Sequence, residues 1–304
     1  MICAFLPRTL SLSISASNTA GNARGLNCAG CTVYCCNDIQ GTRPRDAMSD
    51  PLSPLALTLV VITRDAGAQL AECLASVDFA AEKLVIDSGS EDDTVQIARG
   101  SGARVIAHEW QGFGAQKNFA VAQAANDWVL CLDADERVSA ELGGAIRAAL
   151  ATPRFSAYTM PRCNRFLGRW LRHGEGYPDW NLRLFDRRHA RWSDDAVHEH
   201  VLADADVGRL EGDLLHLSGE SLDAYLAKQN HYTTLQAAAL HARGERFSVA
   251  RLVLSPVVRF FRFYVLRAGF LDGVAGVVHI AIGCHNSFCK YAKLRALELA
   301  EGAR

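Results

Sequence analysis

The chain has 304 residues, 49% of them hydrophobic and 21% charged, which is enough for one large α/β domain or for a domain with a smaller appendage. Its formal net charge of −1 argues against a general nucleic-acid binder, because such proteins are strongly basic. The sequence holds no uncharged apolar run of about 18 residues or more, so we predict no membrane-spanning helix.

The N-terminal segment 1–54 has neither helical nor strand periodicity and is rich in Ser, Asn, Gly, Thr and Cys. We expect an extension that is disordered or not native, with the functional protein starting at Met48. Its Cys28-x-x-Cys31 motif lacks a second pair and a nearby histidine, so a four-ligand metal site is not completed. Scattered cysteines such as Cys131, inside an apolar run, are typical of reduced core residues in a cytosolic protein.

A regular alternation of strands and helices begins at Leu57 and belongs to a predicted domain over 55–245. Strands are expected at 57–63, 83–88, 103–108 and 127–133, with helices at 68–77, 93–102 and 115–125. This order predicts an α/β fold with a doubly wound, mostly parallel sheet and right-handed crossovers. In such sheets ligands bind beyond the carboxyl ends of the strands.

Two carboxylates, Asp133 and Asp135, follow the last of these strands. Their spacing puts them on the same side of an extended chain, where like charges repel. Capping of the next helix does not account for them, because "SAEL" (139–142) already supplies a start signal at Ser139. Carboxylate oxygens are preferred ligands of Mg²⁺ and Mn²⁺, which also bind phosphates, so we predict a metal-bound diphosphate at this edge of the sheet.

An unusually basic stretch, "MPRCNRFLGRWLRHG" (160–174), follows later in the domain. Its arginines are Arg162, Arg165, Arg169 and Arg172, at spacings of three and four residues. On a helix they would line one face, suited to phosphorylated or acidic acceptor groups near a membrane.

The tail, 246–304, is apolar and aromatic but carries several arginines. On a helical projection Arg259, Arg262 and Arg267 fall within one arc, which is the pattern of an amphipathic helix in a membrane interface whose arginines reach lipid phosphates. The alternative is a buried helical hairpin that caps the sheet or forms a dimer face.

Four motifs at the strand ends resemble those of a known family. They are "VVITRDAG", "LVIDSGSEDDT", "GFGAQKNFA" and "WVLCLDADERV", in this order. The chain is similar to family 2 glycosyltransferases of the GT-A fold over about 57–294. The motifs "YPDWNLRLFDRR" and "AVHEHV" make it similar to the bacterial enzymes that add a β-linked glucose to the lipopolysaccharide inner core.

This resemblance implies roles for single residues. Thr63, Asp65, Lys117 and Asp133 would lie against a nucleotide-sugar donor, and Asp87 would hydrogen-bond the uracil or the ribose. Asp135, together with Asp133, would bind Mg²⁺ or Mn²⁺. Two carboxylates compete as the base that deprotonates the acceptor hydroxyl, and Glu199 is favoured over Asp179 because "VHE" falls where the family's catalytic acidic motif occurs.

The implied reaction is an inverting, metal-dependent transfer of a hexose, expected to be glucose from UDP-glucose, onto a lipid-linked lipopolysaccharide core acceptor. The expected partners are a UDP-sugar, that acceptor and the membrane surface, with no nucleic acid. The expected location is peripheral, on the inner face of the cytoplasmic membrane. Two rivals stay open: a nucleotidyltransferase or sugar-nucleotide pyrophosphorylase on the same fold, and a catalytically inactive membrane-attached scaffold.

Overall fold

The computed structural model describes residues 53–195, 199–219 and 221–302. Nearly all of the predicted extension 1–54, with its Cys28-x-x-Cys31 motif and Met48, lies outside the described residues, as does His198 in the "AVHEHV" motif.

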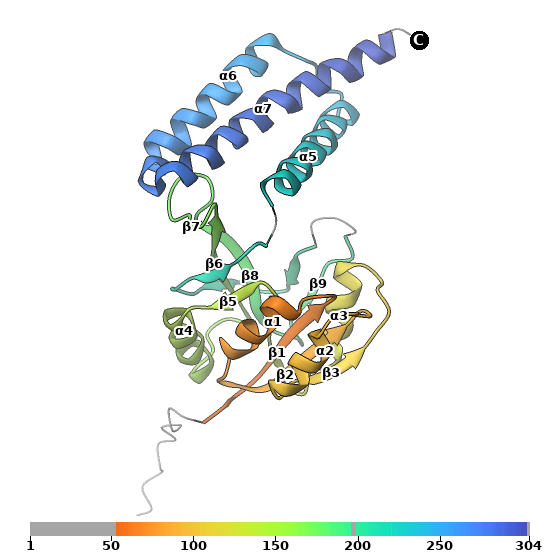
Figure 1. Cartoon of the computed structure of the whole chain (residues 1–304), viewed down its shortest axis with the longest axis vertical. Helices are drawn as coiled ribbons and strands as arrows, with labels where there is room; N and C mark the ends of the chain where they lie inside the picture. The colour runs from red at the N-terminus through yellow and green to blue at the C-terminus, as the bar shows by residue number, and fades with distance from the viewer. Residues whose placement is uncertain (1–52, 196–198, 220, 303–304) are drawn as a thin grey trace, which may run out of the picture. The chain divides into compact units, whose positions relative to one another are not determined.

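The first four strands form the parallel half of one large sheet (Figure 1). They are β1 (Leu55–Thr63), β2 (Ala80–Asp87), β3 (Arg104–Ala107) and β4 (Trp128–Asp133), in the order β3-β2-β1-β4. The register places Thr63 beside Asp87 and Ile62 beside Asp133, so the carboxyl ends of the three central strands meet at one edge. The edge at which ligands were predicted to bind therefore exists.

Both faces of this sheet are covered. Leu57, Leu59 and Val61 of β1 point into a core shared with α1 (Gly67–Ala75), α2 (Thr94–Gly100) and α4 (Ala140–Ala151). Val60, between them, points into a second core with α3 (Phe113–Gln123) and Trp192. Because alternate residues of β1 are buried on opposite faces, the strand is apolar throughout except at Thr58 and Thr63. The doubly wound arrangement predicted from the sequence is confirmed.

The second half of the sheet is mixed. It continues in the order β4-β8-β6-β12-β5, and β8 is antiparallel to both β4 and β6, whereas β12 is parallel to β6. The bounds are β5 (Glu136–Val138), β6 (Ala157–Phe166), β8 (Asp179–Asp186) and β12 (Leu214–His216). Short strands β7 (Arg169–Trp170) and β11 (Val207–Arg209) also pair with β6, and β9 (Ala190–Trp192) pairs with β10 (Val201–Ala203).

The prediction of a helix at 160–174 is wrong, because this segment forms a β-hairpin. Arg162 and Arg165 lie on β6, and the chain turns back through Leu167 and Gly168 into β7. Both turn residues have positive φ, 45° and 79°, as in the tight turns that suit the twist of a β-hairpin. Residues three apart on a strand point to opposite sides, so the four arginines do not share a face.

The tail is helical, as predicted. Its elements are α6 (Val249–Phe260), a π-helical turn η1 (Phe261–Leu266), a 3₁₀ turn η2 (Gly269–Asp272) and α7 (Gly273–Gly302). A further helix, α5 (Leu222–Ala242), precedes the tail within the predicted domain 55–245. Figure 1 shows α6 running beside α7. Among the described residues no single helix is long and apolar enough to cross a membrane, although the bent pair Val249–Leu266 and Gly269–Gly302, at 75°, passes that test jointly.

Candidate active site

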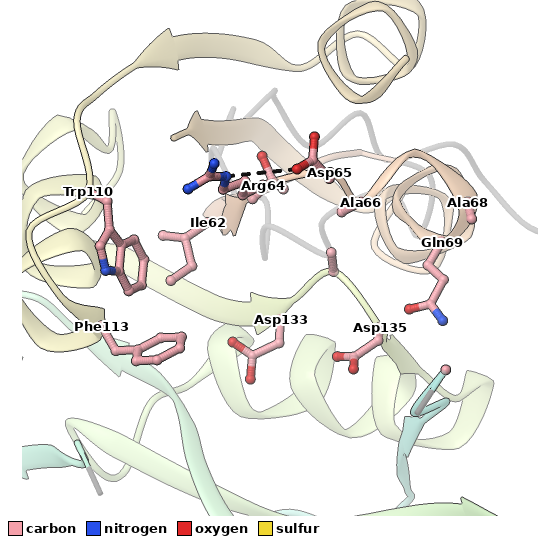
Figure 2. Close-up of a pocket in the computed structure, with 13 residues that line it drawn as sticks. Ile62, Arg64, Asp65, Ala66, Ala68, Gln69, Trp110, Phe113, Asp133 and Asp135 are labelled. Carbon is pink, nitrogen blue, oxygen red and sulfur yellow. Dashed lines mark ion pairs between the residues drawn. The ribbon is translucent and has the colours of Figure 1, made fainter. Parts of the chain in front are cut away.

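A cavity of about 620 Å³ opens at the carboxyl edge of the parallel strands (Figure 2). One wall is the segment 62–69, which leaves β1 and enters α1, and another is 133–135, which leaves β4. Trp110, Phe113 and Gly219 complete the lining. Four residues predicted from the sequence to bind donor or metal line this cavity: Thr63, Asp65, Asp133 and Asp135.

The loop after β1 is held in a strained conformation by the loop after β2. Asp65 has φ 50°, a left-handed conformation that costs about 1 kcal/mol in most residues but is tolerated by Asp. Its N–H donates to the Ser90 hydroxyl at 2.9 Å, and its carboxylate accepts from the Glu91 N–H at 2.8 Å. These bonds fix the position at which Asp65 borders the cavity.

Asp87 lies just behind this lining. Its side chain accepts from the N–H groups of Gly89 and Ser90 at 3.1 and 3.0 Å, and from the Thr63 hydroxyl at 3.3 Å. The carboxylate therefore shapes the turn after β2, and its predicted contact with the nucleotide stays a prediction.

Asp133 is bound by two cations. Arg183 Nη2 lies 2.7 Å from one carboxylate oxygen and Lys117 Nζ lies 3.3 Å from the other. Desolvation acts to raise the pKa of Asp133, but the charges and hydrogen bonds of Arg183 and Lys117 outweigh it and hold that pKa well below its usual range. Asp133 is thus a fixed anion whose charge is already compensated.

The same contacts extend into a chain of alternating charges that reaches both candidate bases. Lys117, only 5% exposed, also lies 3.1 Å from Glu199. In the other direction Arg183 pairs with the fully buried Glu136 at 2.9 Å. Arg162 lies 3.5 Å from Glu136 and 2.8 Å from Asp179. Glu199 and Asp179 therefore sit at opposite ends of one network, with Asp133 between them.

Asp135 has a different kind of partner, which sequence reasoning missed. Its Oδ2 lies 3.1 Å from His216 Nε2, and His216 Nδ1 lies 2.7 Å from Asn164 Oδ1. If Nδ1 donates its proton to Asn164, Nε2 turns a lone pair toward the carboxylate of Asp135, and a cation between them satisfies both. A histidine whose second nitrogen donates to an oxygen is the usual arrangement at metal sites.

Asp135 and His216 fit a divalent cation whose remaining coordination positions are filled by a bound nucleotide and water. Among the described residues no group of three or more His, Cys, Asp or Glu could hold a metal ion, and at this cavity one carboxylate and one imidazole would be the protein's ligands. Mg²⁺ and Mn²⁺ commonly take one or two protein ligands and fill the rest of their shell with phosphate oxygens and water. No local pattern in the sequence marks His216, which is 81 residues away from Asp135 and arrives through β12.

Two further cavities adjoin the first. One, of about 590 Å³, is lined by His216, Asn164 and the tip of the β6–β7 hairpin, and it shares Gln69 and Gly219 with the first cavity. The other, of about 410 Å³, holds Glu199 and shares Asp133 with the first. The Asp135–His216 pair and the charge network therefore each lie between two cavities.

The seven predicted acceptor or membrane arginines are distributed among separate contacts. Arg162 pairs with Asp179 and Glu136, Arg165 and Arg169 donate to the carbonyls of Gly168 and Leu271, and Arg172 pairs with Asp213. Arg259 points inward to Glu175 and Ser287, whereas Arg262 stacks over Phe263 and, like Arg267, is exposed.

Several known proteins are similar to this chain in sequence. The family model for glycosyl transferase family 2 matches residues 58–202. An uncharacterized glycosyltransferase of Rickettsia typhi is 32% identical over 256 residues, which cover 80% of this chain and 88% of that protein. The chain belongs to glycosyl transferase family 2. The family and the enzyme class predicted from the sequence, together with the GT-A fold, are confirmed.

Other proteins similar to this glycosyltransferase have lower sequence identity. The lipopolysaccharide core biosynthesis glycosyltransferase LpsC of Rhizobium meliloti is 28% identical over 252 residues, covering 80% of this chain and 93% of LpsC. A solved structure, a mannosyltransferase from Pyrobaculum calidifontis in complex with GDP-Man and Mn²⁺, is 16% identical, with a TM-score of 0.45 over 85% of this chain and 90% of that one.

Proposed function

We propose that this family 2 glycosyltransferase transfers a hexose, glucose from UDP-glucose, onto a lipid-linked lipopolysaccharide core saccharide at the cytoplasmic membrane face. The observation that carries the proposal is the Asp135–His216 pair, supported by Asn164, at the edge of the cavity where α/β sheets bind nucleotides. The name of the relative LpsC supports the class of acceptor.

The residues of the cavity divide the work of donor binding. Asp135 and His216 would hold Mg²⁺ or Mn²⁺, which supplies positive charge to the departing nucleoside diphosphate. Thr63 and Asp65 border the cavity at the end of β1 and in the loop after it, and they would contact the nucleoside. Asp133, already compensated by Lys117 and Arg183, keeps those two cations fixed beside the sugar-binding region.

Glu199 is our choice for the base. Its side chain is 19% exposed, borders the cavity that Asp133 also lines, and pairs with Lys117. From there it accepts the proton of the acceptor hydroxyl as the hydroxyl attacks, and a single displacement inverts the anomeric centre. Asp179, which is 40% exposed and oriented by Arg162, is the second candidate.

A donor screen tests this function. The full-length protein is supplied with a core saccharide and with UDP-glucose, UDP-galactose or GDP-mannose as donor. Of these donors, UDP-glucose should be the one that releases its nucleoside diphosphate, and this release should require Mg²⁺ or Mn²⁺ and stop in EDTA. Asp135→Asn should lower this release by about 100-fold or more, because an amide does not replace an anionic ligand. Undiminished release in EDTA, or no release from any UDP-sugar, would refute the proposal and favour one of the two rival functions.

A further inference from the structure

The outer side of α6, η1 and the start of α7 carries an unusual set of exposed apolar side chains. No residue of α6 is buried. The set includes Val253, Val257, Phe261, Leu266, Phe270 and Val274, whose exposed fractions range from 47% to 78%. Single exposed apolar residues are ordinary, but a contiguous group marks a site of interaction. We call this set the docking face.

The docking face is one side of a helix whose other side is packed. Val249, Val253 and Val257 follow one another at intervals of four, which puts them on the same side of α6. On the opposite side Leu252 and Arg259 are half-buried, and Arg259 reaches Glu175 and the Ser287 hydroxyl of α7. The packed side thus fixes α6 on α7 and leaves the docking face outward.

The docking face carries exposed positive charge. From residue 246 to residue 271 the sequence holds five arginines and no acidic residue, although Arg251 pairs with Glu245 and Arg259 with Glu175. The first acid after them, Asp272, is 2% exposed and accepts hydrogen bonds from the N–H groups of Arg172 and His173, so it does not offset them at the surface. Arg262 and Arg267 are exposed within the same segment.

Exposed apolar side chains next to exposed arginines favour an anionic bilayer surface as the partner. An apolar face enters the headgroup region of a bilayer while arginines at its rim reach lipid phosphates, and each basic residue near an anionic surface adds attraction. A second copy of the chain is disfavoured, because a two-fold contact would place the same arginines against each other. The bend of 75° between Val249–Leu266 and Gly269–Gly302 lies within the docking face, and a segment that lies along a bilayer surface accommodates such a bend.

We propose that the docking face binds the surface of an anionic bilayer and brings the cavity beside His216 to a lipid-linked acceptor. That cavity is bordered by His279 of α7 and by Tyr225 of α5 as well as by β6. Arg169 of the hairpin also donates to the Leu271 carbonyl at 2.9 Å, so the docking segment is joined to the cavity wall. The acceptor part of this inference rests on the proposed function; the binding to lipid does not.

Vesicle co-sedimentation of the full-length protein tests the proposal. Vesicles of phosphatidylglycerol and phosphatidylcholine are compared with vesicles of phosphatidylcholine alone. The double variant Val257→Asp/Leu266→Asp adds charge to the docking face at two exposed positions. Leu299→Asp is the matched control, since Leu299 is also exposed on α7 but outside the face. A third variant, Arg262→Gln/Arg267→Gln, removes two charges.

The wild-type protein should bind the anionic vesicles, the double Asp variant should bind at least about tenfold more weakly, and the Gln variant roughly 25-fold more weakly at low salt. Leu299→Asp should bind like the wild type. Metal-linked UDP binding, measured on all four proteins, should be unchanged, which separates a failure here from a failure of the proposed function. Absence of wild-type binding, an equal loss in Leu299→Asp, or a wild-type dimer that the double Asp variant dissociates would overturn the proposal.

Discussion

Each carboxylate at the cavity has its own partner, and the partner decides what that carboxylate does. Asp133 is neutralised by Lys117 and Arg183, whereas Asp135 faces an imidazole that Asn164 orients. Two aspartates one residue apart therefore have different tasks. In the proposed function Asp135 would be the metal ligand, whereas Asp133 holds the side chains of Lys117 and Arg183 in place.

The assignment of the base is tested by a pair of substitutions. Glu199→Gln should lower kcat by about 100-fold or more, because the amide still accepts from Lys117 but does not take a proton. UDP affinity should not change. Asp179→Asn is the matched variant, and it should keep most of the turnover. An inactive Asp179→Asn beside an active Glu199→Gln would transfer the role to Asp179.

The sequence predicted Asp133 and Asp135 because their signal is local: two acids directly after a buried strand. His216 and Asn164 could not be predicted in this way, because their positions depend on the pairing of β12 with β6 and β5. The charge network was missed for the same reason. Its members come from α3, β4, β5, β6 and β8 and from residue 199, and they meet only in the folded chain.

At the level of elements, the parallel strands were predictable because both of their faces are buried and the composition alone marks them. The β6–β7 hairpin was not predictable from the sequence. Its arginines repeat at three and four residues, a spacing that also suits a helix, while the decisive feature is the positive φ of Leu167 and Gly168.

A pair of glycine substitutions tests this account of the hairpin. Gly168→Ala should destabilise the protein by about 1 kcal/mol, because a Cβ is disfavoured at φ 79° even though nothing lies within 4 Å of it. Gly144→Ala, inside α4 and equally uncrowded, should stabilise by about 0.5–1 kcal/mol. Urea unfolding measures both. Stabilisation by both substitutions would contradict the turn geometry.

At the level of the whole molecule, the described chain joins two parts with separate tasks. The sheet gathers at one edge the residues proposed to bind donor and metal, α5 and α7 border the adjoining cavity, and α6 with the start of α7 carries the docking face. The sequence predicted a helical tail with an interfacial pattern, but the inward turn of Arg259 to Glu175 depends on tertiary packing. Arg262 and Arg267 are the members of that predicted group available to a surface.

The central claim is that Asp135 and His216 bind a divalent cation together with a nucleoside diphosphate. Calorimetric titration of UDP into the full-length protein, with Mn²⁺ and with EDTA, tests it most directly. We expect Mn²⁺ to strengthen UDP binding in the wild type and in the control variant Asn230→Ala. Asn230 lies on α5, and its side chain accepts a hydrogen bond from Lys293 of α7 rather than lining the cavity. In His216→Ala this gain should fall by about tenfold or more. Equal UDP binding with Mn²⁺ and with EDTA, or a full gain in His216→Ala, would contradict the account.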